Sequence, residues 1–173
     1  MIEIIRQDFQ NNKRLFNAKK HQLAALLGKN TIIEHVGSTA IPEMSGKNII
    51  DILVAAGSVA ELKNFSEKLQ SAGFFAGKNS RSNYIFLASK QEETASGDTH
   101  VHLAIKNTPI YDDFIVLRQY LLRNPTVAKE YSNTKEVFAK VANFSRGDYK
   151  KLKSKYVDES LTRARKELRD GAK

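Results

Sequence analysis

The chain has 173 residues, a formal net charge of +9 at pH 7 and no cysteine. This length suits one compact domain with its own hydrophobic core, and the lack of cysteine excludes disulfides, thiolate metal sites and cysteine nucleophiles. Because the N-terminal segment is charged and no segment has the unbroken apolar length of a membrane helix, we expect a cytoplasmic protein with no membrane partner.

Hydrophobic periodicity and chain-breaking residues predict the following helices and strands. They are a helix over 4–27, strands over 31–36 and 48–56, a helix over 58–72 capped by Ser58, strands over 74–76, 84–89 and 99–106, and helices over 111–123, 126–143 and 148–169. Residues 37–47 and 90–98 are expected to form loops. The strand 48–56 is apolar along most of its length, which indicates a central position in a sheet.

This order of elements predicts an α+β fold with a helical C-terminal part. We expect a single domain over residues 1–173, with a sheet-containing core at about 1–108 and a helical part at about 109–173. The sequence contains no internal repeat and no low-complexity tract.

The positive charge favours anionic partners such as nucleotides, phosphorylated metabolites or nucleic acid. Much of the excess lies in residues 148–173, where acidic residues are interspersed with the basic ones. That mixture is typical of a solvated helix face, and no zinc-finger spacing or aromatic-studded sheet motif is present. We therefore expect a nucleotide or another phosphorylated small molecule as the partner, rather than nucleic acid. The oligomeric state is left open.

A Gly-Ser pair, Gly37 and Ser38, ends the first predicted strand. Glycine lets the backbone approach a ligand closely and leaves N–H groups free to bind anionic oxygen, and Ser38 and Thr39 add hydroxyl groups. The same dipeptide is common in ordinary turns. The pattern is compatible with a phosphate-binding turn and with a turn of no further function.

Asp51 is an acidic residue within the apolar segment from Ile49 to Val54. An ionised carboxyl in such surroundings is costly unless it is paired, hydrogen-bonded or bound to a cation. If its strand lies beside the strand that ends at Gly37, Asp51 can hold a divalent metal over a phosphate bound there. The alternative is a buried aspartate that backbone N–H groups satisfy, or that pairs with Lys47 or an arginine.

His100 and His102 are expected on one face of the strand 99–106, because side chains alternate between the faces of a strand. Their spacing of roughly 6.5 Å along the strand suits two ligands of one metal, or one ligand and one proton carrier. The alternative is a pair of polar residues on a solvated sheet face.

The segment from Ile33 to Val54, IEHVGSTAIPEMSGKNIIDILV, resembles the signature of the GrpB family, bacterial proteins grouped with the nucleotidyltransferase superfamily. The resemblance extends to His100-Val101-His102 and to residues 113–135 and 147–157. It implies a nucleotidyltransferase-like mixed β-sheet flanked by helices, with Gly37-Ser38 as the glycine-serine turn and Asp51 as the first acid of a paired-acid motif. In active superfamily members such acids bind two magnesium ions that position a nucleoside triphosphate.

The sequence departs from that paired-acid motif. Leu53 stands two residues after Asp51, where the second acid would project on the same face, and no later strand offers an obvious third carboxylate. One carboxylate with two imidazoles favours manganese, zinc or another transition metal over magnesium. Glu43 and Asn48 stand where the family usually has glycine and proline, and Glu43 is either a substitute ligand or a solvated loop residue.

The functional hypothesis is a metal-dependent nucleotidyltransferase, or a related phosphoanhydride-processing enzyme, that acts on a nucleotide or phosphorylated metabolite. Asp51 would be the catalytic residue, and the cofactor would be a divalent metal (Mg, Mn or Zn) held by Asp51, His100 and His102. The candidate phosphate-binding residues are Gly37, Ser38, Thr39, Lys47 and Arg118. The alternative is a catalytically inactive module that binds a nucleotide or phosphometabolite without turnover.

Overall fold

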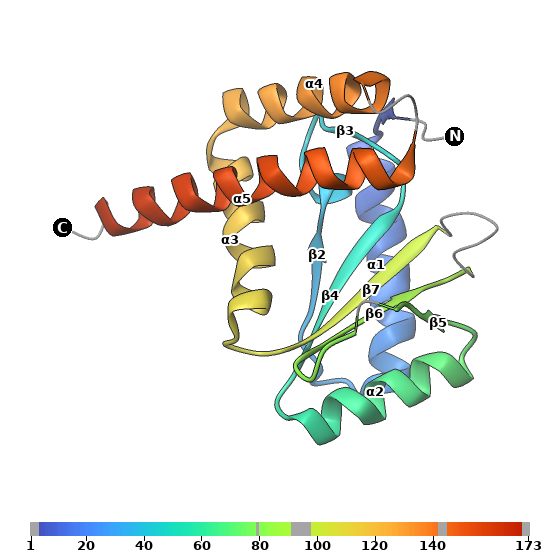
Figure 1. Ribbon diagram of the computed structural model, residues 1–173. Coiled ribbons are helices and arrows are strands. Elements are labelled where there is room, and N and C mark those ends of the chain that lie inside the picture. The colour runs from blue at the N-terminus through green and yellow to red at the C-terminus, as the bar shows by residue number, and fades with distance from the viewer. Residues whose placement is uncertain (1–3, 79, 91–97, 142–144, 171–173) are drawn as a thin grey trace.

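The computed structural model describes residues 4–78, 80–90, 98–141 and 145–170. Its helices are α1 (Phe9–Leu27), the short η1 (Ser38–Ala40), α2 (Val59–Ser71), α3 (Pro109–Arg123), α4 (Pro125–Val141) and α5 (Arg146–Asp170). Its strands are β1 (Ile5–Arg6), β2 (Ile33–Val36), β3 (Ser45–Gly46), β4 (Ile50–Ala56), β5 (Phe75–Ala76), β6 (Tyr84–Ala88) and β7 (Thr99–Ile105). The predicted α+β fold with a helical C-terminal part is therefore confirmed (Figure 1).

The main sheet is five-stranded and has the order β2-β4-β7-β6-β5. The neighbouring strands β4 and β7 run parallel, whereas β2 and β4, β6 and β7, and β5 and β6 run antiparallel, which makes the sheet mixed. The position of β4 between β2 and β7 confirms the central strand expected from its apolar sequence. The register places Asp51 of β4 directly beside His100 of β7.

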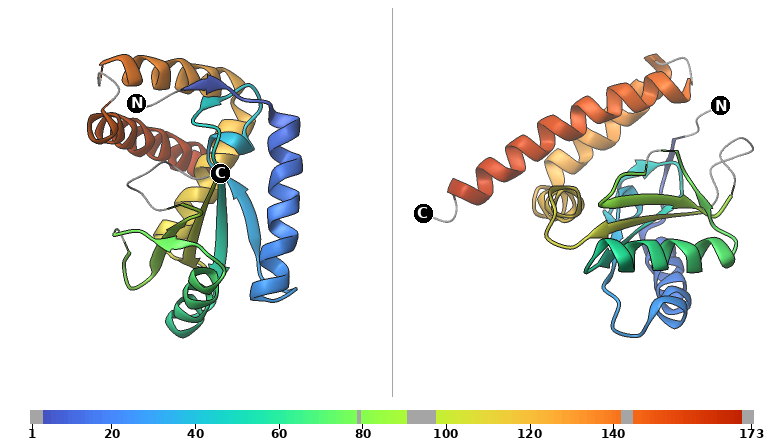
Figure 2. Two further views of the ribbon diagram at one scale, coloured as in Figure 1. Left: turned by 90° about the vertical axis from the view of Figure 1, so that its right-hand side faces the viewer. Right: turned by 60° about the horizontal axis from the view of Figure 1, so that its bottom comes forward.

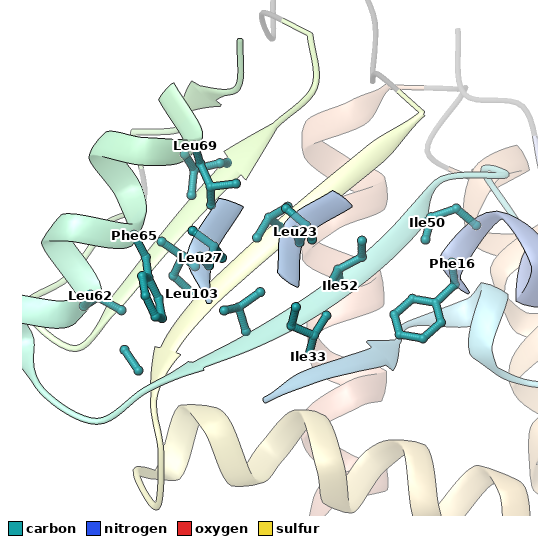
Figure 3. Close-up of a cluster of buried hydrophobic side chains, with 14 residues drawn as sticks. Phe16, Leu23, Leu27, Ile33, Ile50, Ile52, Leu62, Phe65, Leu69 and Leu103 are labelled. Carbon is teal, nitrogen blue, oxygen red and sulfur yellow. The ribbon is translucent and has the colours of Figure 1, made fainter. Parts of the chain in front are cut away.

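Helices cover both faces of this sheet. The three views together show α1 and α2 on one face, and α3 on the other with α4 and α5 beyond it (Figures 1 and 2). Figure 3 shows the core on the first face, where side chains such as Phe16, Leu23, Ile52 and Phe65 gather. Residues that alternate with Ile52 along β4 project toward α3 instead, which explains why this strand is apolar on both sides.

The helical part has a core of its own that includes two residues from the segment before β4. Tyr120, Tyr131 and Ala164 of three different helices pack with Ile41 and Met44 in this core. The segment between β2 and β4 therefore belongs to the packing of the helical part as well as to the sheet.

Ser45, on β3 within the same segment, is hydrogen-bonded to α4. Its N–H donates to Oγ of Ser132 at 2.7 Å, and its own Oγ donates to Oε1 of Glu136 at 3.0 Å. These two bonds attach α4 to β3.

The start of α1 and the segment 37–47 differ from expectation. The helix begins at Phe9 rather than near residue 4, because the carboxylate of Asp8 accepts a hydrogen bond from the N–H of Asn11 at 3.0 Å and caps it. The residues before this cap form β1, which pairs with β3. The predicted loop 37–47 thus contains η1 and β3, and of the predicted loop 90–98 residues 91–97 lie outside the described ranges.

The predicted cap of α2 by Ser58 is confirmed, and the side chain of Glu61 makes a second bond at the same helix end. Oγ of Ser58 accepts a hydrogen bond from the N–H of Glu61 at 3.1 Å, while the Glu61 carboxylate accepts from the N–H of Gly57 at 2.5 Å. Along the described ranges, no helix combines the length and the apolar character needed to cross a membrane.

Candidate functional site

Asp51, His100 and His102 come together on the side of the sheet that faces α3. His100 is the register partner of Asp51 on the parallel strand β7, and His102 follows two residues later on the same face. Oδ1 of Asp51 lies 3.2 Å from Nδ1 of His100 and 3.4 Å from Nε2 of His102. All three side chains are partly buried. The structure thus brings both predicted histidine ligands within hydrogen-bonding distance of the predicted ligand Asp51.

His102 has a second hydrogen-bond partner on β6. Its Nδ1 lies 2.8 Å from the hydroxyl oxygen of Tyr84. The rings of Phe86 and Phe114 flank it, with centroids 5.4 and 4.6 Å from the centroid of the imidazole. Because the two ring nitrogens face different partners, their protonation is linked: when Nδ1–H donates to Tyr84, Nε2 presents a lone pair on the side of Asp51.

The carboxyl of Asp51 is held in its ionised form. Burial by itself would raise the pKa of this carboxyl, but hydrogen bonds from His100 and His102 and their electrostatic attraction outweigh it. The net effect places the pKa of Asp51 well below its usual range. At neutral pH the site therefore contains a fixed negative charge that can attract a cation.

Gly37 lies directly against the carboxylate of Asp51. It has φ 72° and ψ −167°, a conformation that residues with a side chain rarely adopt. A Cβ added at Gly37 would lie 2.3 Å from Oδ2 of Asp51 and 2.8 Å from its Cβ. The glycine is thus required both by its backbone conformation and by the closeness of the acid, and the Gly-Ser turn adjoins the Asp51 site.

The hydroxyl residues that follow Gly37 have different environments. Ser38 is partly buried, and a Cβ added at Gly46 would lie 2.5 Å from its Oγ. Thr39 is fully buried, and its Oγ1 lies 2.9 Å from Nε2 of His35, whose ring stacks on Phe16 of α1. The hydroxyl of Thr39 is therefore engaged inside the protein, which does not favour its predicted contact with phosphate.

The place of the missing second acid is part of the hydrophobic core. Leu53 is 0% exposed and packs with Val36, Ala104 and Tyr111 between the sheet and α3. A carboxylate there would be buried among apolar side chains. This packing leaves no polar environment for a second acid at position 53.

The two predicted cationic residues lie in different surroundings. Nζ of Lys47, an exposed residue, lies 5.2 Å from the ring centroid of Tyr149. Nη1 of Arg118 donates hydrogen bonds to Oε2 of Glu34 and to the carbonyl oxygen of His35, both at 2.8 Å. These bonds connect α3 to β2, so a contact between Arg118 and a ligand would compete with two existing acceptors at Nη1.

Glu43 and Asn48, which depart from the usual family residues, both have positive φ, 56° and 55°. Residues with a side chain adopt this region rarely, and proline cannot adopt it. The side chain of Glu43 is 83% exposed and lies 3.6 Å from Arg6. Glu43 is therefore a solvated loop residue, and the interpretation as a substitute ligand is not supported.

Sequence reasoning did not single out Lys135, a residue of α4 that is only 2% exposed. Its Nζ lies 4.7 Å from the ring centroid of Tyr131. Burial lowers the pKa of Lys135 to about 7; the charge of Lys153 acts in the same direction, and the charge of Asp51 opposes them. In the sequence, the one indication of this contact is that Lys135 follows Tyr131 by four residues, which places both on the same side of a helix.

A hollow in the surface lies away from these residues. It is lined by Gly147, Lys150, Lys151, Ser154, Lys155, Asp158 and Glu159. All of its lining comes from α5, it mixes charges of both signs, and none of the predicted site residues contributes to it. The candidate site is therefore the Asp51 region and not this hollow.

The donor set around Asp51 suits a transition metal by atom type. Metal–ligand bonds of roughly 2.0–2.2 Å in a tetrahedral site place neighbouring ligand atoms roughly 3.3–3.6 Å apart, close to the two separations from Oδ1 of Asp51. As the side chains stand, however, no group of three or more His, Cys, Asp or Glu residues in the described part of the chain is arranged to hold a metal. Both imidazoles approach the same carboxylate oxygen, so a metal would replace these contacts. The metal stays a prediction.

Comparison with known proteins gives consistent matches. A family model described as GrpB protein matches residues 2–163. The glutamate-rich protein GrpB of Alkalihalophilus pseudofirmus is 31% identical over 161 residues, which cover 88% of this chain and 90% of that protein. The protein YqkA of Bacillus subtilis is 31% identical over 129 residues, which cover 72% of this chain but only 36% of YqkA.

One solved structure matches along almost the whole chain. The conserved protein GrpB from Enterococcus faecalis has a TM-score of 0.83 at 23% identity, and the match covers 96% of this chain and 99% of that one. This similarity shows a shared fold.

Proposed function

Because the chain belongs to the GrpB family, we propose that it binds a phosphorylated small molecule, such as a nucleotide, at one divalent metal held by Asp51, His100 and His102. The reaction proposed at this site is transfer of a nucleotidyl group or cleavage of a phosphoanhydride. The observation that carries the proposal is the approach of both imidazoles to the ionised Asp51 carboxylate, beside the Gly37 turn.

Each side chain has a definite task in this proposal. Asp51 supplies the negative charge, and His100 and His102 supply neutral nitrogen ligands. With a metal bound at Nε2 of His102, Tyr84 would accept Nδ1–H and so keep the lone pair of Nε2 directed at the metal. When bound, the metal would polarise a phosphoryl oxygen and stabilise the charge that develops on it. The exposed backbone at Gly37 leaves room for that phosphate next to the carboxylate.

The composition of the site favours manganese or zinc over magnesium. Magnesium is held in proteins mainly through carboxylates and the substrate's own phosphates, whereas the described contacts of this site join one carboxylate, that of Asp51, to two imidazoles. Imidazole nitrogens suit transition metals better.

A second candidate function follows from Leu53. Since this buried leucine occupies the place of the second acid, the site lacks the charge that a two-metal transfer reaction uses. The second candidate is a module that binds the same phosphorylated ligands without turning them over.

The test is calorimetric titration of Mn²⁺, Zn²⁺ and Mg²⁺ into the wild-type chain and into Asp51→Asn. The matched control is Asp158→Asn, which removes one exposed carboxylate from α5. We expect Asp51→Asn to weaken Mn²⁺ or Zn²⁺ binding by more than about a hundredfold, and Tyr84→Phe to weaken it by about ten- to a hundredfold. Equal metal affinities in the two aspartate variants would refute the proposed metal site.

Addition of nucleoside triphosphates to the metal-loaded protein then separates the two candidates. Formation of diphosphate, pyrophosphate or a nucleotidylated product, followed by ³¹P NMR, supports the enzyme. Saturable binding with no product over a day supports the binding module.

A further inference from the structure

Lys135 is a buried amine that lacks an ionic partner within the described part of the chain. Lys135 is 2% exposed, yet no carboxylate oxygen of the described residues lies within 4.0 Å of its Nζ. Glu136, the next residue, accepts a hydrogen bond from Ser45 instead. A buried ammonium without an anion is costly, so an unpaired one needs an explanation.

Aromatic and charged neighbours surround this amine. The ring of Tyr131 lies beneath Nζ of Lys135 and stacks on Tyr156 of α5, with ring centroids 4.8 Å apart. Lys153 of α5 is near enough to disfavour the charged form of Lys135, whereas Asp51 of β4 is near enough to favour it. The helical part therefore presents positive charge toward the side of the sheet that carries Asp51.

Other basic residues adjoin the same aromatic group. Tyr149 of α5 is affected electrostatically by Lys153 and by Tyr131, and Nζ of Lys47 lies 5.2 Å from the Tyr149 ring centroid. Lysines from the segment before β4, from α4 and from α5 thus gather around tyrosines. The charge of Lys153 disfavours the charged form of Lys135, and a bound anion would relieve this repulsion.

We propose that Lys135 is the phosphate-binding cation of this protein, and that it binds a terminal phosphate or pyrophosphate group of the ligand whose other contacts are at Asp51. The proposal deepens the proposed function and rests on it for the contacts at Asp51. It adds that the ligand extends from the sheet to α4, which favours a di- or triphosphate over a monophosphate. Ligand binding would supply the anion that the buried amine lacks.

The test measures pyrophosphate binding by calorimetry at pH 6, with EDTA present to remove metals. At this pH Lys135 is mostly protonated, because its pKa is about 7. We expect the wild type to bind pyrophosphate and Lys135→Met to bind it at least about tenfold more weakly, which is the effect of losing a hydrogen bond to a charged group. The matched control is Lys140→Met, which removes an exposed lysine from the same helix.

A second readout is proton uptake. At pH 7.5 the wild type should take up more protons than Lys135→Met on binding pyrophosphate, visible as a binding heat that depends on the ionisation enthalpy of the buffer. The difference between the two proteins removes the change in protonation of the pyrophosphate itself. The other groups that act on Lys135 are Lys153, Asp51 and the Tyr131 phenol, so Lys153→Met is measured in parallel and should retain part of the uptake. If Lys135→Met does not fold, Lys135→Gln serves in its place.

The outcomes separate this inference from the proposed function. The inference is overturned if the Lys135 and Lys140 variants bind pyrophosphate with equal affinity. It is also overturned if neither the wild type nor Asp51→Asn binds pyrophosphate. Asp51→Asn abolishes the metal site and removes a negative charge near the anion, so it should strengthen pyrophosphate binding in EDTA. Binding that depends on Lys135 in a protein that binds no metal would uphold the inference and refute the metal site.

Discussion

Replacement of Gly37 by alanine should damage both the fold and the site, by two separable effects. The backbone conformation of Gly37 costs residues with a side chain on the order of 1–3 kcal/mol. The added Cβ would also lie 2.3 Å from Oδ2 of Asp51, so the carboxylate must move away. Loss of one of its charged hydrogen bonds to the histidines costs about 1.5–3 kcal/mol. We therefore expect a total loss of about 2.5–6 kcal/mol in the free energy of unfolding.

Two other glycines provide matched controls for these effects. Gly73 has φ 92° but nothing within 4 Å of an added Cβ, so Gly73→Ala reports backbone strain alone. Gly147 has neither a positive φ nor a neighbour within 4 Å, and Gly147→Ala should be neutral or stabilise the protein by about 0.4–1 kcal/mol. The predicted order of stability is Gly147→Ala, then Gly73→Ala, then Gly37→Ala.

Urea denaturation followed by circular dichroism measures all three variants under one condition. Metal titration of Gly37→Ala then reports the displaced carboxylate, and affinity should fall even where the variant is fully folded. The reasoning is refuted if Gly37→Ala loses no more stability than Gly73→Ala, because the approach to Asp51 would then contribute nothing.

Two further predictions concern His35 and Arg118. Burial lowers the pKa of His35 from 6.5 to about 4; the charge of Asp51 opposes this shift and the charge of Arg118 adds to it. The unfolded state therefore binds the proton more readily than the folded state does. The stabilisation due to neutral His35 should be complete above pH 6.5, and the free energy of unfolding should fall by about 3 kcal/mol as the pH approaches 4. In urea melts, His35→Gln should reduce this pH dependence. The control His21→Gln, at an exposed residue, should not change it. Arg118→Met should lower the free energy of unfolding by about 2 kcal/mol, because the bonds of Arg118 to β2 are lost, and it should leave metal affinity unchanged. The control Arg123→Met should stay within about 0.5 kcal/mol of the wild type. Lost affinity for a phosphorylated ligand without lost stability would instead place Arg118 at the ligand.

The fold was largely predictable because most elements carry strong local signals. The apolar segment around Ile52 and the Ser58 cap identified β4 and α2, and both are confirmed. The two-residue strands β1 and β3 could not be predicted, since two residues show no periodicity. The cap at Asp8 was readable in principle, but the apolar residues before it extended the helical pattern too far.

The candidate site was only partly predictable. Strand alternation places His100 and His102 on one face, but their closeness to Asp51 depends on a parallel pairing of β4 and β7 that no local pattern specifies. Tyr84 reaches His102 only because β6 pairs with β7 in one particular register. The burial of Lys135 depends on how helices of the C-terminal part pack, which lies beyond any sequence window.

The packing of Ile41 and Met44 has a consequence for cooperativity. Both residues lie in the short segment between the Gly37 turn and Asp51, and both pack in the core of the helical part. Detaching the helices would expose both apolar side chains to water and break the bonds of Ser45 to α4. Unfolding of the helical part should therefore disturb the turn beside Asp51, and the two parts should unfold together.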